Sequence, residues 1–299
     1  MLLLTRSVSR YNGLNERSPL MPIKIFTDSG SDIPKHIQAQ YGIEVIPLPV
    51  LFSDGPLPQE SSIEDFYYKL KTFDKLPTTS SPNPSQFLEA YKRAEPGSDL
   101  LVICMSANVS STYQSAIIAR DMLLDEGFDG KIEVLDSKTF SGGLSLIVST
   151  AAKWSESCTS LEELTTKLQQ LIDDTRAYFT LETLENIIKG GRLNRLAGGV
   201  ASVLNIKLLL RINEEGTIEV VEKTRGFRKA VNSLIAKLDE KQHDYENAAI
   251  AIVHSNNEKL ALEVKERILE KHPFHEVYLS CMGPVMGTHA GEGGIGFAF

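Results

Sequence analysis

Three stretches of this sequence carry side chains that could hold an anion. Two are rich in hydroxyls, Thr78 to Ser81 and Ser106 to Thr112, and the third, Gly283 to Phe299, places a histidine among glycines. Serine and threonine are neutral hydrogen-bond donors, and histidine can donate or accept a proton near neutral pH. Such a set suits a small carboxylate head held by several hydrogen bonds. We therefore expect one anion-binding site made by Thr79, Ser80, Ser110, Ser111 and His289.

Familiar catalytic patterns are missing from the sequence. It has no G-x-S-x-G or Walker A pattern, and no G-x-G-x-x-G follows the first expected strand. Asp28 and Asp32 in the turn DSGSD most simply cap that turn. His272 and His275 lack a second pair of ligands, so we expect surface residues and no metal site. An enzyme that uses Asp28 or His289, either a small-molecule phosphotransferase or a hydrolase, stays open as an alternative.

The hydroxyl clusters follow expected strands and precede expected helices. The apolar run Leu100 to Met105 predicts a buried parallel strand, and the chain after it turns into a helix that begins near Ser110. Asn83 at an N-cap, with Gln86 three residues later, predicts another helix just after Thr79. In open α/β sheets, ligands bind where strands end and helices begin. We expect the site at this edge of the sheet.

The order of elements predicts an α/β fold with two lobes. Met21 to Thr27 is typical of a first buried strand, and strands then alternate with helices as in a parallel sheet. After residue 176 the pattern changes, because Ile206 to Ile212 and Thr217 to Lys223 predict an antiparallel hairpin. We expect an extension at 1–20, an N-terminal α/β lobe with a parallel sheet at 21–176, and a second α/β lobe with a mixed sheet at 177–299.

The composition is typical of a cytoplasmic protein. No segment approaches the ~20 apolar residues of a membrane span, and the apolar run at the start of the sequence is too short for a signal peptide. Cys104, Cys158 and Cys281 form no CxxC pair, which favours a reducing compartment. We expect a cytoplasmic chain without a membrane span.

Charge is distributed unevenly along the chain. The net charge of −8 opposes general nucleic-acid binding, because phosphate backbones attract basic surfaces. Residues 187–231 nevertheless carry nine Lys or Arg and four Glu, a local +5 that leaves −13 for the remainder. This block could face an acidic partner or a polyanion, or be an ordinary solvated surface.

Six motifs resemble, in order, those of the DegV family. They are TDSGSDIP at 27–34, PTTSSPNPSQF at 77–87, SANVSSTYQSA at 106–116, VLDSKTFSGG at 134–143, ENIIKGGRL at 185–193 and GTHAGEGGIG at 287–296. The resemblance implies a ligand tunnel between two α/β lobes that binds a long-chain fatty acid. It also implies a separate ATP-binding fatty acid kinase subunit, which phosphorylates the carboxylate to an acyl phosphate. The chain would then be no enzyme, need no cofactor, and contact a membrane at most transiently.

The resemblance also assigns residues. Head-group contacts fall on Thr79, Ser80, Ser110 and His289, and partner contacts fall on Arg192 and on Arg225 or Arg228. The sequence departs from the family at Ser111, where a glycine is expected, and at Glu292, where a proline is common. Ser111 either adds a donor or crowds the head group. A lipid sensor that regulates a partner without phosphorylation stays open as a second alternative.

Overall fold

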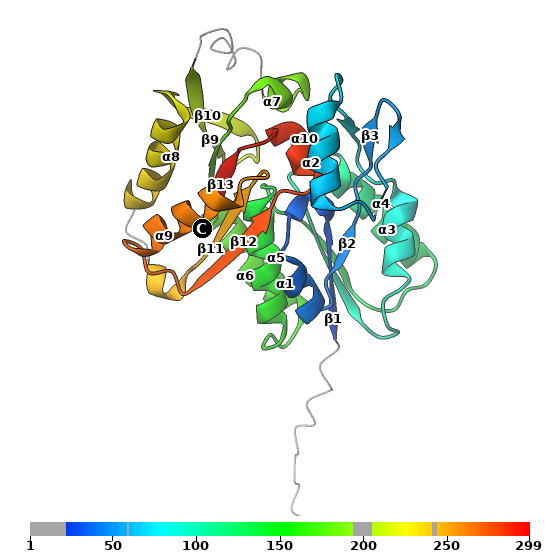
Figure 1. The fold of residues 1–299 in the computed structure, drawn as a ribbon. Helices are drawn as coiled ribbons and strands as arrows, with labels where there is room; N and C mark the ends of the chain where they lie inside the picture. The colour runs from blue at the N-terminus through cyan, green and yellow to red at the C-terminus, as the bar shows by residue number, and fades with distance from the viewer. Residues whose placement is uncertain (1–21, 59, 194–204, 241–243) are drawn as a thin grey trace, which may run out of the picture.

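The computed structural model describes residues 22–58, 60–193, 205–240 and 244–299, and the expected extension at 1–20 lies outside them (Figure 1). The first sheet has the strand order β2-β1-β6-β7, and every pairing in it is parallel. Its strands are β1 (Ile23–Asp28), β2 (Glu44–Ile46), β6 (Asp99–Cys104) and β7 (Ile132–Asp136). The parallel N-terminal sheet is thus confirmed.

The second sheet has six strands in the order β10-β9-β8-β13-β11-β12. It comprises β8 (Ala177–Thr180), β9 (Ile206–Ile212), β10 (Ile218–Arg225), β11 (Ala249–His254), β12 (Glu276–Cys281) and β13 (Ile295–Ala298). The pairing of β11 with β12 is parallel and the others are antiparallel, so the expected mixed sheet is confirmed. The limits of the two lobes stay a prediction.

A small third sheet, β4-β3-β5, lies beside the first. It contains β3 (Val50–Phe52), β4 (Gly55–Pro56) and β5 (Thr78–Thr79). The stretch 44–52 is divided between β2 and β3. Pro47 and Pro49 account for the break, because proline has no N–H to donate to a neighbouring strand.

Capping boxes begin two of the helices. Ser62 and Asp65 form one at the start of α2, and Asn83 and Gln86 form the one that the sequence predicts at the start of α3. The helices are α1 (Lys35–Gln40), α2 (Ile63–Thr72), α3 (Pro84–Tyr91), α4 (Thr112–Asp125), α5 (Gly142–Ser155), α6 (Leu161–Asp174), α7 (Glu185–Lys189), α8 (Phe227–Ala236), α9 (Glu258–Leu269) and α10 (Pro284–Ala290).

Helix α5 joins the two sheets. It contacts β1 and β6 of the first sheet and β11 and β13 of the second, and most of its residues are buried. A helix that is apolar on all sides is stable only when it is surrounded, which explains its central place. The largest core cluster accordingly contains residues of both sheets, whereas α3 with α4, and α8 with α9, cover smaller cores on the outer faces.

The last stretch of the chain begins with a helix, although its glycines predict a loop. Pro284 occupies the first turn of α10, where its missing N–H costs nothing, and His289 lies in the last turn. Helices α10 and α2 lie side by side (Figure 1). The Tyr67 hydroxyl of α2 donates to the main-chain oxygen of Met282 at 3.0 Å, which anchors the entry to α10.

Candidate functional site

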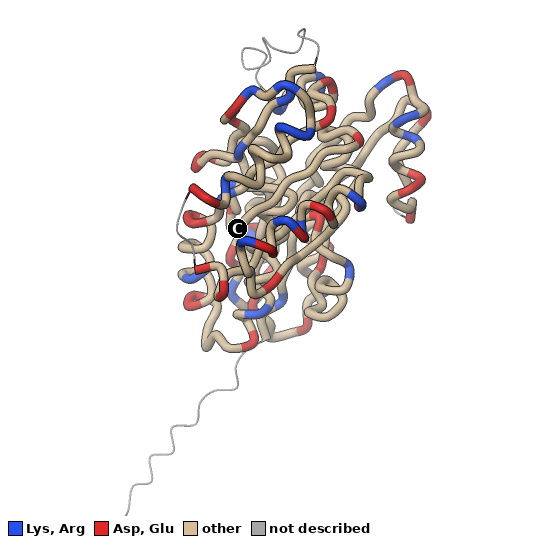
Figure 2. Tube along the Cα trace, turned by 60° about the vertical axis from the view of Figure 1, so that its left-hand side comes forward, with Lys and Arg blue, Asp and Glu red and all other residues tan. Residues whose placement is uncertain are grey.

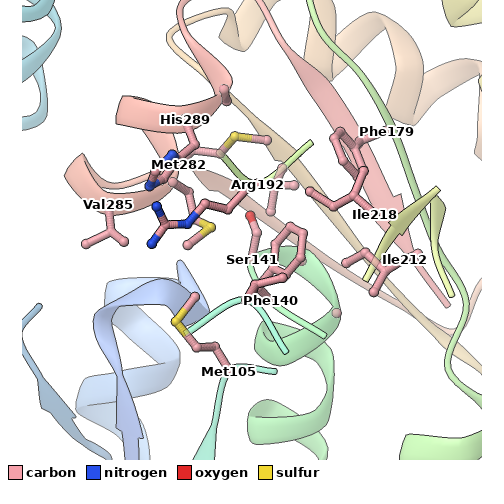
Figure 3. A pocket seen from close by; sticks show the side chains of 18 of the residues that line it. Met105, Phe140, Ser141, Phe179, Arg192, Ile212, Ile218, Met282, Val285 and His289 are labelled. Atoms are coloured by element: carbon pink, nitrogen blue, oxygen red, sulfur yellow. The ribbon is translucent and has the colours of Figure 1, made fainter. Parts of the chain in front are cut away.

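One pocket brings together the segments that the sequence singles out (Figure 3). The space between its lining residues, with open solvent included, is about 890 Å³. Most of its wall is apolar and comes from both sheets and from α5 and α10, with Met105, Phe140, Phe179, Ile212, Val253 and Val285 among the contributing side chains. Both parts of the fold therefore build one apolar cavity.

One end of the pocket is polar. Thr79, Ser80 and Ser110 line it together with His289, although they come from β5, the loop before α4, and α10. The Thr79 Oγ1 lies 2.9 Å from His289 Nε2. The structure thus brings together four of the five predicted head-group residues, and it places three neutral hydroxyls and an imidazole at one end of an apolar cavity.

Ser111 is the predicted residue that the pocket leaves out. It is exposed, and its hydroxyl donates to Ser81 Oγ at 2.9 Å. Ser81 does line the pocket and lies 2.9 Å from Ser110, oxygen to oxygen. The sequence prediction did not include Ser81, although the hydroxyl run TTSS at 78–81 was the available signal. Ser111 supports the head-group end indirectly, through Ser81.

His289 is neutral in this setting. Burial, with a smaller contribution from the positive charge of Arg192, lowers the pKa of its imidazole to about 4. Its Nδ1 is buried against Gly190 and has no hydrogen-bond partner among the described residues. A buried N–H without an acceptor is costly, so the geometry favours the proton on Nε2. Nε2–H then donates to Thr79, which leaves the Thr79 hydroxyl proton free to point at a ligand.

Arg192 borders the pocket, a place that the sequence did not predict. The prediction put it on a partner-facing surface, and its side chain is indeed exposed, but it also lines the cavity near His289 (Figure 3). Its Nη1 donates to the main-chain oxygen of Gly190 at 2.6 Å. Arg192, Val109 and Ile218 line both the pocket and an adjoining surface groove. The mouth of the pocket is therefore bordered by Arg192 on the side of His289 and by Ile218 on the opposite side.

The other predicted partner-facing arginines lie away from the pocket. Arg225 ends β10 and Arg228 lies in the first turn of α8, and both are exposed. In the basic block at 187–231, glutamates form ion pairs with Lys189, Lys207 and Arg211. Within the described part of the chain, Lys223, Arg225, Arg228 and Lys229 form none. Figure 2 shows the charged residues mainly on helices and turns, with few on the central strands.

Asp28 and Asp32 support the backbone near the pocket and do not line it. The Asp28 carboxylate accepts the N–H groups of Gly30 and Met105, each at 2.8 Å. Asp32 accepts the Ser141 hydroxyl at 2.5 Å and the Gly283 N–H at 2.7 Å. Burial raises the pKa of Asp28 to about 6 and that of Asp32 to about 7. The bond from Gly30 to Asp28 is the turn cap that the sequence predicts, whereas Asp32 caps no turn and instead holds Ser141 and Gly283, which are remote in the sequence.

Within the described ranges, no group of three or more His, Cys, Asp or Glu side chains could hold a metal ion. No helix in that part of the chain is long and apolar enough to cross a membrane. His272, which the sequence places at the surface, is buried, and its Nε2 lies 3.0 Å from Asp239 Oδ1.

Comparison with known proteins identifies the family. A model described as uncharacterised protein, DegV family, matches residues 22–299. The Fatty acid-binding protein of Thermotoga maritima is 32% identical over 285 residues, which cover 93% of this chain and 97% of that protein. A DegV-family protein of Ruminococcus gnavus, solved with vaccenic acid, has a TM-score of 0.86 at 25% identity and covers 93% of this chain and 100% of its own.

A second solved structure is named for a kinase subunit. The fatty acid kinase (Fak) B3 protein of Streptococcus pneumoniae, loaded with linoleic acid, is 25% identical with a TM-score of 0.82. The alignment covers 93% of this chain and 99% of that one. These similarities extend over both sheets and the pocket between them. The chain belongs to the DegV family.

Proposed function

We propose that this chain binds one long-chain fatty acid in the pocket, with the carboxylate at the polar end. The observation that carries the proposal is the division of one cavity into an apolar body and an end with several hydroxyls. Burying about 14 methylenes contributes up to ~11 kcal/mol before the costs of association, at ~0.8 kcal/mol per CH₂. Affinity then comes mainly from the tail. The three similar proteins named above are described with fatty acids.

The polar end suits a carboxylate better than a phosphate. A carboxylate needs a few donors in a fixed arrangement, which the hydroxyls of Thr79, Ser80 and Ser110 supply. The imidazole of His289 is neutral near pH 7 and orients Thr79 by its hydrogen bond. Arg192 supplies one positive charge from the mouth side. Neutral donors hold the head group without the cost of burying a compensating ion.

We further propose that the bound carboxylate is presented to a separate ATP-binding kinase subunit. At the mouth, Arg192 on the side of His289 and Val109 line both the pocket and the outer groove. An enzyme docked over the groove would reach the carboxylate while the tail stays buried. The four cations at 223–229, which form no ion pair with a described residue, offer contacts for the acidic surface of a partner. On this proposal the chain is a non-catalytic carrier.

The alternatives from the sequence gain less support. A phosphotransferase or hydrolase that uses Asp28 would need an accessible carboxylate, but Asp28 is fully buried and both its oxygens accept main-chain N–H groups. His289 as a catalytic base would need an acceptor nitrogen open to a reactant. Its Nδ1 instead faces Gly190. A lipid sensor would use the same pocket, so only the kinase reaction separates it from a carrier.

Two measurements test the proposal. Mass spectrometry of an organic extract from the purified protein is expected to find close to one fatty acid per chain. Turnover of phosphate esters by the protein alone, with no lipid in the extract, would instead favour the enzyme. Addition of an ATP-binding fatty acid kinase subunit and ATP is then expected to yield acyl phosphate. A loaded protein that supports no phosphorylation would leave the sensor as the better explanation.

A further inference from the structure

The pocket is separated from a second cavity by a thin wall. The second cavity, about 690 Å³ with open solvent included, lies between β7, α6 and the β9–β10 turn and is lined mainly by polar side chains, among them Lys138, Asp173 and Asn213. Ala177 and Ile212 line both cavities. No head-group residue lines the second cavity. Ala177 and Ile212 therefore lie between the apolar part of the pocket and a polar space.

Strand register explains how this wall is built. Ala177 of β8 pairs with Ile212 of β9, and Ile212 pairs with Ile218 of β10. Directly paired residues on neighbouring strands project to the same face of a sheet. The three side chains thus form one row across the sheet, and all three line the pocket. Figure 3 shows Ile212 and Ile218 on the side of the cavity opposite His289.

The chemistry changes across the wall. On the pocket side, the neighbours of Ile212 are Phe140, Phe179 and Ile218, all apolar. On the other side, Lys138 pairs with Asp173 at 3.1 Å, and Thr139 is buried beside them. Burial of the methyl end of an acyl chain against the apolar side chains is favourable in free energy, whereas burial among the polar side chains contributes little. The wall marks the end of the space that favours an acyl chain.

We propose that Ile212, supported by Ala177, is the end stop that sets the longest acyl chain the pocket accepts. The proposal rests on the fatty-acid binding proposed above. Truncation of Ile212 to alanine frees the volume of about three methylene-sized groups, so chains two or three carbons longer fit without bending. Each additional buried CH₂ strengthens binding about fourfold. A larger side chain at position 177 shortens the space for the acyl chain, so the longest chain accepted becomes shorter.

The test loads delipidated protein with an equimolar mixture of palmitate, stearate and arachidate and measures the bound lipids by mass spectrometry. Ile212→Ala is expected to raise the bound arachidate-to-palmitate ratio about tenfold over wild type. Ala177→Leu is expected to lower it by a similar factor. The control is Val221→Ala, an exposed position on β10 outside the pocket, which should keep the wild-type ratio. Thermal unfolding checks that each variant is folded.

The outcomes separate this inference from the proposed function. A wild-type protein that takes up none of the three acids overturns both. If the wild-type protein binds the acids, but Ile212→Ala shows the same arachidate-to-palmitate ratio as wild type, only the end-stop proposal is overturned. If Ala177→Leu does not fold, the ratio in Ile212→Ala decides. A shift to longer chains in Ile212→Ala but not in Val221→Ala supports the assignment of Ile212.

Discussion

At the scale of single residues, the head-group end depends on how His289 is held. Its ring donates to Thr79 on one side and packs against Gly190 on the other, where a Cβ would lie 2.4 Å from Nδ1. A glycine is required there because any side chain would push the ring out of place. His289 is thus a positioning residue for Thr79, and the hydroxyls make the direct contacts that we propose for the carboxylate.

The first prediction concerns His289→Ala. The tail supplies most of the affinity, so bound lipid per chain should change by less than about threefold, while phosphorylation per bound lipid should fall at least about tenfold because the carboxylate is misplaced. Extraction with mass spectrometry gives the first quantity and acyl-phosphate formation gives the second. His36→Ala, at an exposed histidine of α1 outside the pocket, is the control. Loss of lipid with normal phosphorylation of the remainder would contradict this role.

The second prediction concerns Asp32, whose pKa burial raises to about 7. Between about pH 4 and pH 7 the folded protein holds a proton that the unfolded chain has lost, so this carboxyl makes the free energy of unfolding fall as pH rises through that window. Asp32→Asn removes the charge. Its amide can accept the Gly283 N–H and donate to Ser141, so the variant should be more stable than wild type at pH 8, by about 1–3 kcal/mol.

Asp28→Asn is the matched control for that measurement. Both Asp28 oxygens accept main-chain N–H groups, so an amide NH₂ would face a second donor and the variant should lose about 1–3 kcal/mol at pH 8. Denaturant unfolding at pH 5 and pH 8 gives both values. The interpretation of Asp32 is wrong if its variant is destabilised at pH 8 as much as the Asp28 variant.

At the scale of elements, α10 depends on its contact with α2. A Cβ at Gly287 would lie 2.6 Å from Phe66 Cε1 and 2.8 Å from the Tyr67 hydroxyl. Gly287→Ala should therefore separate the two helices, lower the free energy of unfolding by about 1–3 kcal/mol and displace His289. Gly142→Ala in α5 is the control, because its nearest contact is an ordinary 3.4 Å from Val253. Equal stability of the two variants would show that α10 tolerates the shift.

The same helix shows what could and could not be predicted from the sequence. Helix α3 was predicted correctly because its signals, Asn83 and Gln86, lie within one turn. The sequence predicts a loop at α10 because glycine disfavours helices. Gly287 is needed in this helix because Phe66 leaves no room for a side chain there, and Phe66 is remote in the sequence. Arg192 was expected to face a partner, and only the packing of two sheets around α5 shows that it also borders the pocket.

At the scale of the whole molecule, contacts at both ends of the pocket join the two sheets. Near α10, Asp32 accepts the Gly283 N–H. Near the β9–β10 turn, the Ser106 hydroxyl donates to the Gly216 oxygen at 2.8 Å and the Asn108 amide donates to the Glu215 oxygen at 2.6 Å. Ser106 and Asn108 lie just before the head-group serine, Ser110. The turn that follows Ile212 is therefore tied to the loop that carries Ser110.

The surface of the molecule supplies the last prediction. Arg225 and Arg228 are exposed, lie outside the pocket and form no ion pair within the described part of the chain. Their combined replacement by alanine should leave bound lipid unchanged. It should raise the concentration of carrier needed for half-maximal kinase activity about tenfold at low salt, because rim charges mainly speed association. The difference should shrink as salt screens the surfaces.

Lys35→Ala is the control for charge removal in general, because Lys35 of α1 is exposed and forms no ion pair with any residue that the structure describes. If both variants lose affinity equally, net charge matters and a specific docking surface does not. If the arginine variant couples to the kinase as wild type does at low salt, these residues have no part in docking. A tenfold loss confined to the arginine variant would place the kinase over the end of β10 and the start of α8, because those elements carry the two side chains.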